Sequence, residues 1–498
     1  MLIKVFGAAV QGIDATLITI EVNSSRGCMF YLVGLPDSAV KESHQRIISA
    51  LLVNGYKMPT SNIVVNMAPA DIRKEGSAYD LPLAIGLLGA NETISSEKFS
   101  RYLLMGELSL DGSIQPIKGA LPIAIKARED GFEGLIIPQQ NAREAAVVNQ
   151  LKVYGVSNIK EVVEFFNNER ELEPTVVNTR EEFYQQQTNC DLDFADVKGQ
   201  ENVKRALEVA AAGGHNLIMV GAPGSGKSMM AKRLPSILPP LSLGESLETT
   251  KIHSVTGQLK RGSSLISQRP FRDPHHTISQ VAMVGGGSFP QPGEISLAHN
   301  GVLFLDELAE FPRNVLEVLR QPLEEHQVTV SRVNGSFSFP AHFMLAAALN
   351  PCPCGYYPDR SKCSCTEHQV RRYLGKISRP LLDRIDICVE AAPVTYRDIR
   401  TEQVNESSEE IRIRIEAARK IQSERYAGSG IYTNSEMGIR QIRKFCNLKE
   451  EDEAFLQQIF SRLGLSARGC HKILKVARTL ADLDGKEQIE RAHLREAA

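Results

Sequence analysis

Residues 216–228 read NLIMVGAPGSGKS, and this stretch decides the fold. Residues 221–228 match every fixed position of the phosphate-loop pattern G-x-x-x-x-G-K-S/T. The apolar run before them predicts a buried strand, and the residues after them predict a helix that begins near Met229. A chance glycine turn would lack this strand–loop–helix context. The stretch therefore predicts an α/β fold that binds ATP.

The chemistry of the loop assigns a role to each of its parts. Backbone N–H groups would surround the phosphates, and the N-terminus of the following helix favours negative charge. Lys227 is expected to reach the β and γ phosphates, and the Ser228 hydroxyl is expected to hold Mg²⁺. The residues expected around the nucleotide are Gly221, Ala222, Pro223, Gly224, Ser225, Gly226, Lys227 and Ser228.

Two further apolar runs end in polar residues. Residues 301–307, GVLFLDE, predict a buried strand, and ligands of open α/β sheets bind at the carboxyl ends of strands. Asp306 is expected to hold Mg²⁺, and Glu307 is expected to activate or orient the attacking water. Solvated acids at a strand end are the alternative, which the phosphate loop disfavours. Asn350 is expected to orient the water or sense the γ-phosphate, although a lone Asn there is otherwise a turn former.

Composition limits the class of protein. The chain has 498 residues, 42% hydrophobic and 23% charged, with a formal net charge of -2. That length predicts about three domains. No apolar run approaches the ~18 residues of a membrane span, and no signal peptide is evident, so we expect a cytoplasmic protein without a membrane partner. The near-balance of charge disfavours a surface that is basic all over.

The pattern of apolar residues divides the chain into four parts. Residues 1–165 alternate strands and helices in a compact α/β unit. Residues 166–190 are polar and predict a linker, with an exposed helix as the alternative. Residues 191–392 show a second α/β pattern with a mostly parallel sheet. Residues 393–498 predict helices.

Four of the nine cysteines crowd one short segment after Asn350. Their spacing, C-x-C-x₈-C-x-C with Gly355 and Pro358 to turn the chain, suits a tetrahedral structural Zn²⁺ site. Reduced surface thiols or a redox disulfide are the alternatives, and His368 is a spare ligand. The four candidate ligands are Cys352, Cys354, Cys363 and Cys365.

Four strings together carry a family resemblance. They are GAPGSGKS, GVLFLDE, AAALNPCPCGY and RPLLDRIDI. They resemble the magnesium-chelatase-like group of AAA+ ATPases and, within it, the YifB/ComM family of bacterial competence-associated proteins. The resemblance covers nearly the whole chain. It implies an AAA+ P-loop NTPase core with an insertion in its second helix and a C-terminal helical lid.

The resemblance also implies a ring, expected to be a hexamer, with ATP at the subunit junctions. Arg384 matches the arginine that completes the neighbour's site, where its fork would stabilise the phosphoryl transition state; Arg379 is the alternative. Arg468 resembles the second sensor, with Arg478 as the alternative. Either arginine could instead form a surface ion pair.

Two implied features would face the central pore of the ring. The insertion maps to about residues 268–300, and a hairpin maps to residues 328–339, turning at Asn334-Gly335. In a ring, every subunit would also contribute the same few basic residues to the pore, where they would bind the phosphates of a DNA strand. A solvated loop of mixed charge is the alternative. The basic residues are Lys251, Lys260, Arg261, Arg269, Arg272 and Arg332.

The N-terminal part resembles the Lon protease domain, of the ribosomal S5 domain 2-like fold. The matching strings are KEGSAYDLPLAIGLL and GELSLDGSIQPIKGALPIAIKA. Ala78 stands in the place of the catalytic serine and Leu121 in that of the lysine, while Ser77 and Lys118 are out of register. Proteolysis is therefore not expected, because the dyad needs a hydroxyl and an amine within hydrogen-bond reach.

The activity implied by the resemblance is an ATP-driven motor on DNA. It would bind single-stranded or branched DNA without reading sequence and drive branch migration during DNA uptake and recombination. One alternative is a chelatase-type subunit that powers metal insertion into a porphyrin. The other is a protein remodeller, for which Phe289 offers an aromatic pore residue.

Overall fold

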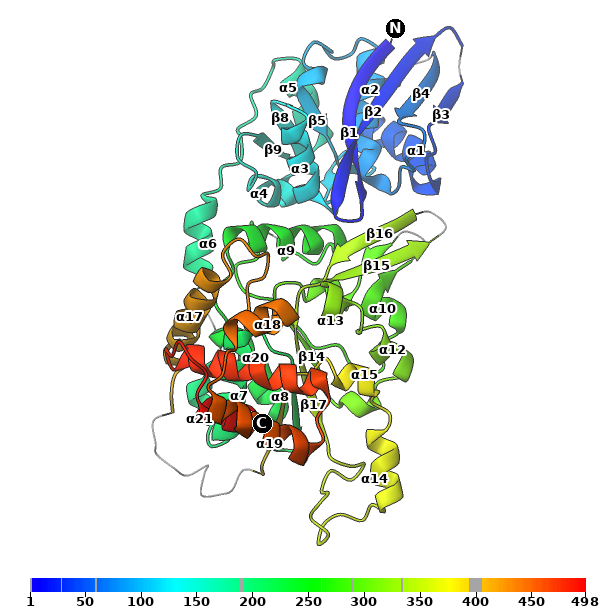
Figure 1. The fold of residues 1–498 in the computed structure, drawn as a ribbon. Coiled ribbons are helices and arrows are strands. Elements are labelled where there is room, and N and C mark those ends of the chain that lie inside the picture. The colour runs from blue at the N-terminus through cyan, green and yellow to red at the C-terminus, as the bar shows by residue number, and fades with distance from the viewer. Residues whose placement is uncertain are drawn as a thin grey trace. The chain divides into compact units, whose positions relative to one another are not determined.

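The structure is a computed structural model that describes residues 2–27, 29–58, 61–187, 192–260, 262–287, 290–332, 335–393 and 405–498. It contains two compact units (Figure 1). The first comprises Met1–Gln186 and Leu243–Ser267, and the second comprises Gln187–Ser242 and Gln268–Ala498. None of the described helices is both long and apolar enough to cross a bilayer.

The first unit is built on a seven-stranded mixed sheet with the order β3-β4-β2-β1-β5-β8-β9. β1 pairs antiparallel with β2 and parallel with β5. Alternate residues along β1 and β2 are buried, as expected for strands with one face on a core. The strands are β1 (Leu2–Gln11), β2 (Asp14–Ser25), β3 (Phe30–Val33), β4 (Asn62–Ala68), β5 (Tyr102–Leu104), β8 (Gly134–Pro138) and β9 (Lys152–Val156).

Helices α2 and α3 pack against strands β1 and β2 of this sheet. Every residue of α2 is buried, which explains the uninterrupted apolar sequence that follows Asp80, whose carboxylate pairs with Arg46. The main helices of the unit are α1 (Ser38–Val53), α2 (Asp80–Ala90), α3 (Ala120–Glu129), α5 (Ile159–Phe166), α6 (Thr179–Gln187) and α9 (Leu243–Thr256).

Helix α9 belongs to the first unit, although its sequence lies inside the predicted ATPase core. It packs against α3, and the carbonyl of Ser254 accepts a hydrogen bond from Gly119 N at 3.0 Å. The Ser254 hydroxyl donates to the buried carboxylate of Glu144 at 2.5 Å. Residues 243–267 thus interrupt the segment 191–392 that the sequence predicts to be one core.

Part of the predicted linker, residues 166–190, is helical. Helix α6 occupies its second half, and the Phe183 side chain on that helix is buried. Glu182 accepts hydrogen bonds from Arg143 at 2.8 Å and from Ser264 at 2.9 Å, both in the first unit. The alternative interpretation of the polar segment, a helix, therefore fits its C-terminal half.

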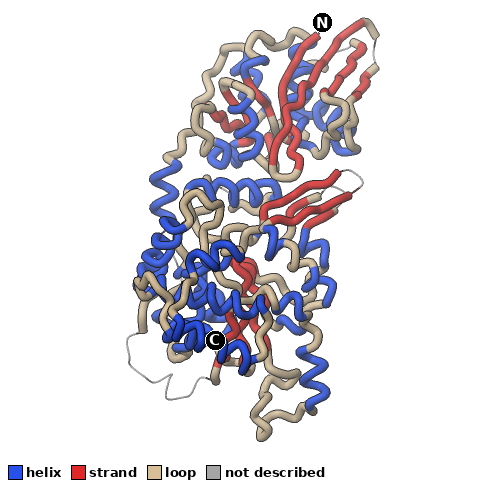
Figure 2. The backbone as a smooth tube through the Cα atoms, viewed as in Figure 1, coloured by secondary structure: helices blue, strands red, loops and turns tan. Residues whose placement is uncertain are grey.

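The second unit contains a five-stranded parallel sheet with the order β11-β14-β17-β10-β18, surrounded by helices (Figure 2). Strand β10 lies between β17 and β18 and is parallel to both, so the C-terminal ends of these three strands lie at the same edge of the sheet. The strands are β10 (Leu217–Gly221), β11 (Phe271–Arg272), β14 (Val302–Leu305), β17 (Met344–Leu349) and β18 (Ile387–Ala391). Helices α7 (Glu201–Gly213) and α8 (Lys227–Ile237) flank β10 in the sequence.

The α/β fold with a parallel-sheet core is confirmed, and the C-terminal region is helical, as predicted. The buried apolar side chains of this C-terminal region form a separate small core centred on α20. The helices are α17 (Ser408–Arg425), α18 (Ile439–Phe445), α19 (Glu450–Leu463), α20 (Ala467–Leu483) and α21 (Arg491–Ala497).

Both predicted pore features contain strand pairs. Within residues 268–300, β12 (Gly285–Gly286) pairs with β13 (Gln291–Pro292). The predicted hairpin is formed by β15 (Gln327–Arg332) and β16 (Gly335–Pro340). The expected turn residue Asn334 and the aromatic residue Phe289 lie outside the described residues.

Candidate functional site

The phosphate loop connects β10 to α8, as the sequence predicts. Gly226 caps α8 with a φ of +83°, a left-handed conformation that favours glycine. The free N–H groups of the first turn of α8 therefore lie beside the loop, in the arrangement that binds phosphate groups.

Lys227 links the loop to the end of the neighbouring strand. Its Nζ donates to the carbonyl oxygens of Gly221 at 2.7 Å and Ala222 at 2.9 Å, and lies 3.4 Å from Asn350 Oδ1. Burial lowers the pKa of Lys227, and the nearby Asp306 carboxylate opposes this shift. The structure thus brings the predicted lysine and asparagine together at one edge of the sheet.

Ser228 and Asp306 also meet there. The Ser228 hydroxyl donates to Asp306 Oδ2 at 2.5 Å, and the other carboxylate oxygen accepts from Glu307 N at 2.9 Å. Two hard oxygen donors in contact suit Mg²⁺, which binds proteins through few ligands and keeps several waters. The residues present therefore fit the expected ion.

Glu307 presents its carboxylate outward. Its backbone has a φ of +51°, and its side chain is 52% exposed. His276 Nδ1 lies 3.4 Å from Glu307 Oε2, a contact between distant segments that no motif in the sequence indicates. A carboxylate held in this way can accept a proton from an attacking water.

Arg384 lies in the loop between α15 (Arg379–Leu382) and β18. Its side chain is 12% exposed, and its guanidinium forms an ion pair with Glu324 at 2.5 Å and donates to the Pro380 carbonyl. The alternative, Arg379, begins α15 and is exposed. Among the described residues, neither arginine forms a hydrogen bond or ion pair with the phosphate loop of its own chain, which is compatible with a role at a neighbour's site.

The two sensor candidates lie in different environments. Arg468 is in the first turn of α20, its side chain is 69% exposed, and its Nη1 lies 3.8 Å from Asp383. Arg478 is buried, and it forms bonds to Asp482 and to the carbonyl of Glu487 within the lid. Because the Arg478 guanidinium is buried and hydrogen-bonded within the lid, Arg468 is the better candidate to contact a nucleotide.

A lid lysine holds the loop that carries Arg384. Lys472 Nζ donates to the carbonyl oxygens of Ile385 at 2.7 Å and Leu382 at 3.1 Å, which flank Arg384. The sequence reasoning missed Lys472. The available signal was its position four residues after Arg468, because side chains at this spacing share one helix face.

A buried histidine makes a second link between lid and core. His215 Nε2 lies 2.8 Å from Thr479 Oγ1 of α20, and its Nδ1 lies 3.1 Å from Asp386 Oδ2. Asp386 is the last residue of the loop that carries Arg384. Helix α20 is therefore linked to this end of the loop through His215.

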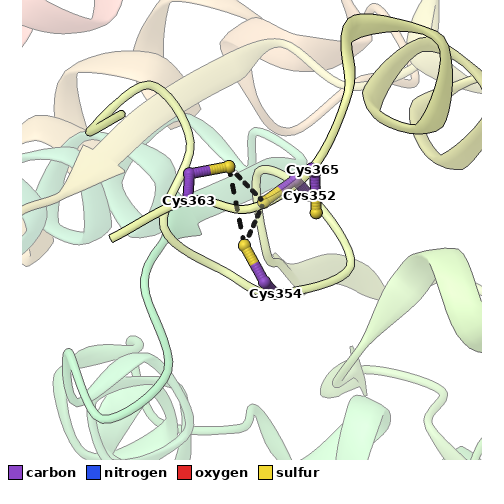
Figure 3. Close-up of side chains that lie close together, drawn as sticks. All are labelled: Cys352, Cys354, Cys363 and Cys365. Atoms are coloured by element: carbon purple, nitrogen blue, oxygen red, sulfur yellow. Dashed lines mark hydrogen bonds between the residues drawn. The ribbon is translucent and has the colours of Figure 1, made fainter. Parts of the chain in front are cut away.

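The four clustered cysteines converge as predicted (Figure 3). Cys352 Sγ lies 3.3 Å from Cys354 Sγ and 3.8 Å from Cys363 Sγ, and all four sulfurs lie within 4.8 Å of one another. A tetrahedral zinc ion with Zn–S bonds of about 2.3 Å requires sulfurs about 3.8 Å apart. The cluster, which includes Cys365, therefore fits Zn²⁺.

The surroundings favour the thiolate form, which a metal requires, at Cys354 but not at every cysteine of the cluster. Burial raises the pKa of the Cys363 thiol. A backbone hydrogen bond with Cys354 lowers the pKa of Cys365, but burial and the neighbouring cysteines outweigh it and raise that pKa to about 11. A hydrogen bond from the backbone of Tyr356 lowers the pKa of the Cys354 thiol to about 6, and Tyr357 N donates to Cys352 Sγ at 3.4 Å. These four thiols are free in the structure. The expected spare ligand His368 is not part of the cluster.

Two of the six basic residues expected around the pore form ion pairs within their own units. Lys251, in the first unit, pairs with Asp14 at 2.9 Å. Arg272, in the second unit, makes two hydrogen bonds to Glu294, at 2.6 and 2.7 Å. Arg261 lies outside the described residues. The charges of Lys251 and Arg272 are therefore neutralised locally by neighbouring carboxylates.

The Lon-like strings hold no Ser–Lys pair among their described contacts. The Ser77 hydroxyl donates to Glu107, and the side chain of Lys118 packs against Gly257. Ala78 and Leu121 supply neither a hydroxyl nor an amine. Ser77 and Lys118 thus have partners other than each other in the described structure.

Three family models match the chain. They are "Magnesium chelatase, subunit ChlI" over residues 193–399, "Subunit ChlI of Mg-chelatase" over residues 20–141 and "Magnesium chelatase, subunit ChlI C-terminal" over residues 405–498. A stretch of 130 residues is also 27% identical to Lon protease 2 of Bacillus subtilis, covering 26% of this chain and 23% of that protein.

Two relatives match along nearly their whole length. Competence protein ComM of Haemophilus influenzae is 42% identical over 495 residues, covering 99% of this chain and 96% of the relative. The uncharacterized protein YifB of Escherichia coli is 42% identical over 495 residues, covering 98% and 95%. This identity, with the family models, shows that the chain belongs to the magnesium-chelatase-like YifB/ComM family of AAA+ proteins.

Proposed function

We propose that this chain is the subunit of an ATP-hydrolysing ring motor that acts on DNA. The observation that carries the proposal is the convergence of Lys227, Ser228, Asp306 and Asn350 at the carboxyl edge of one parallel sheet. A lysine, a hydroxyl, a carboxylate and an amide at a phosphate loop are the groups that phosphoryl transfer requires. The motor is proposed to work in the cytoplasm as a homo-oligomer, with a hexamer as the expected state.

Each residue then has a defined task. The loop N–H groups and Lys227 bind the ATP phosphates, and Ser228 and Asp306 hold Mg²⁺, which neutralises phosphate charge when bound. Glu307 takes a proton from the attacking water, and Asn350 orients that water beside the γ-phosphate. Arg384 completes the site of a neighbouring subunit, and Arg468 contacts the nucleotide from the lid.

DNA is proposed as the substrate because a relative of 42% identity is named a competence protein. The strand pairs β12–β13 and β15–β16 are the candidate DNA-moving elements, and Arg332 lies on the second. Branch migration during DNA uptake and recombination is the specific work we propose. The substrate would be single-stranded or forked DNA, bound through its phosphates without sequence reading.

Forked DNA is expected to raise the ATPase rate severalfold at low salt, and the gain should fall as salt rises, because phosphate contacts release counterions. Arg332→Ala should reduce this gain and leave the basal rate unchanged. The matched control is Arg371→Ala on α14 (Glu367–Leu374), an exposed arginine that pairs with Glu367. A wild-type protein that neither binds DNA nor responds to it at low salt would end the DNA proposal.

A chelatase-type role is the second candidate, because all three family models carry the magnesium chelatase name. The same ATPase site would then power metal insertion into a porphyrin. An ATPase rate that rises with a porphyrin and its metal but not with forked DNA would favour this candidate.

We also propose that the cysteine cluster holds one structural Zn²⁺. Protein purified under reducing, chelator-free conditions is expected to contain about one zinc per chain. Cys363→Ser should lose most of it, whereas Cys388→Ser, which changes an exposed cysteine outside the cluster, should keep it. Elemental analysis measures the content, and less than about half an equivalent in the wild-type protein would refute the site.

A further inference from the structure

The cysteine segment touches the phosphate loop directly. A β-carbon built on Gly355 would lie 2.3 Å from Cδ and 2.7 Å from Cγ of Pro223, the third residue of the phosphate loop. Gly355 also has a φ of +85°, which disfavours any side chain. We call residues 351–366 the metal loop. Its backbone packs on the phosphate loop with no room for a side chain between them.

The metal loop is also joined at both ends to other parts of the nucleotide site. It begins directly after Asn350, whose Oδ1 lies 3.4 Å from Lys227 Nζ. It leads into α14, which carries the buried Tyr373. Burial raises the pKa of Tyr373 to about 12, and the nearby Glu310 and Glu307 carboxylates add to this shift. The segment therefore passes the sensor asparagine, the phosphate loop and the surroundings of the proposed catalytic glutamate.

The metal loop has little apolar material to fix its shape. Its buried cluster consists of Cys352, Cys363, Cys365 and Val370, with Cys354 and Tyr357 packed against it. Four of these six residues are the candidate zinc ligands. A loop whose core consists of metal ligands depends on the metal for its conformation, because the free energy of metal binding then supplies the free energy of folding the loop.

The contact with Pro223 lies next to a ligand. Gly355 follows Cys354 directly, and Gly355 N donates to the carbonyl of Cys352 at 2.9 Å. Two of the four ligands thus fix the residue that packs on the phosphate loop. Any change in the coordination of Cys352 and Cys354 would move Gly355 against Pro223.

We propose that the metal loop is a positioning element of the ATP site: zinc bound by its four cysteines holds Gly355 against Pro223, and this contact keeps the phosphate loop in its nucleotide-binding form. The inference rests on the proposed ATPase function and on the zinc site. It adds that metal occupancy sets nucleotide affinity, with Gly355 as the residue that transmits the effect.

The test measures the binding of a slowly hydrolysed fluorescent ATP analogue, so that hydrolysis does not affect the measured affinity. Gly355→Ala should weaken binding about tenfold or more, the range for residues that support a site from outside it, while keeping its zinc. The matched control is Gly430→Ala. Gly430 has a similar φ, +76°, but an added β-carbon there would meet nothing within 4 Å. It should bind the analogue as the wild-type protein does.

A second measurement uses the unaltered protein, so that folding of a variant does not decide the result. Removing zinc with a chelator should weaken analogue binding to a similar extent, and adding zinc back should restore it. Equal affinity with and without zinc, or wild-type affinity in Gly355→Ala, would overturn the inference and leave the ATPase proposal intact. A zinc-loaded wild-type protein that binds no nucleotide would overturn both.

Discussion

Lys227→Ala is expected to lower the ATPase rate by about 10²–10³-fold, the usual effect of removing one preorganised donor to a developing charge. The Lys227 ammonium lies within hydrogen-bonding distance of the loop carbonyls of Gly221 and Ala222, where it is placed to meet the β and γ phosphates. Alanine removes that charge without adding bulk. A steady-state phosphate-release assay measures the loss.

Lys232→Ala is the matched control for this variant. Lys232 lies on the same helix, α8, but its side chain is half exposed and forms only a 3.6 Å ion pair with Asp273. Its loss should change the rate by less than about twofold, since exposed ion pairs contribute little. A Lys227→Ala rate close to the wild-type rate would mean that hydrolysis occurs at another site.

Arg384→Ala is expected to have an effect of similar or greater size. An arginine supplied across a subunit junction contributes about 10³–10⁵-fold to phosphoryl transfer in proteins that use one. Arg384 pairs with Glu324 within its own chain, and the lid residue Lys472 fixes the carbonyls on both sides of it. We expect the variant to bind ATP normally but to hydrolyse it very slowly.

Arg320→Ala is the control for Arg384→Ala. Arg320 and Arg384 line one groove, and Arg320 forms an ion pair with Glu317, three residues earlier in the chain. Its loss therefore removes a nearby positive charge while leaving Arg384 in place. An Arg384→Ala rate equal to that of Arg320→Ala would show that Arg384 serves only its pair with Glu324.

The nucleotide site could be predicted from the sequence because its residues sit at fixed places in a regular pattern. Gly226 and Lys227 follow an apolar strand and open a helix, and Asp306 ends a second apolar strand. Strand ends of a parallel sheet converge on one edge, so the pattern alone brings these side chains together. The cysteine cluster was predictable for the same reason, since its ligands are close in sequence.

The parts that escaped prediction depend on contacts between distant segments. Nothing in the sequence of α9 indicates that Ser254 binds Glu144 and joins the first unit. The sequence favours Arg468 over Arg478 by resemblance alone, and the burial of Arg478 supplies a physical reason for that order. The packing of Gly355 on Pro223 also joins two loops far apart in the chain, which periodicity cannot relate.

The most direct test of a ring with shared ATP sites is the ATPase rate of a mixture of Lys227→Ala and Arg384→Ala chains. Each variant alone should be nearly inactive. In a mixed ring, an Arg384→Ala subunit keeps its own Lys227 and receives Arg384 from a Lys227→Ala neighbour. Random assembly at equal amounts should restore about one quarter of the wild-type rate, because about one junction in four then holds both residues. A mixture as inactive as its components at every ratio, despite forming mixed oligomers, would contradict the account.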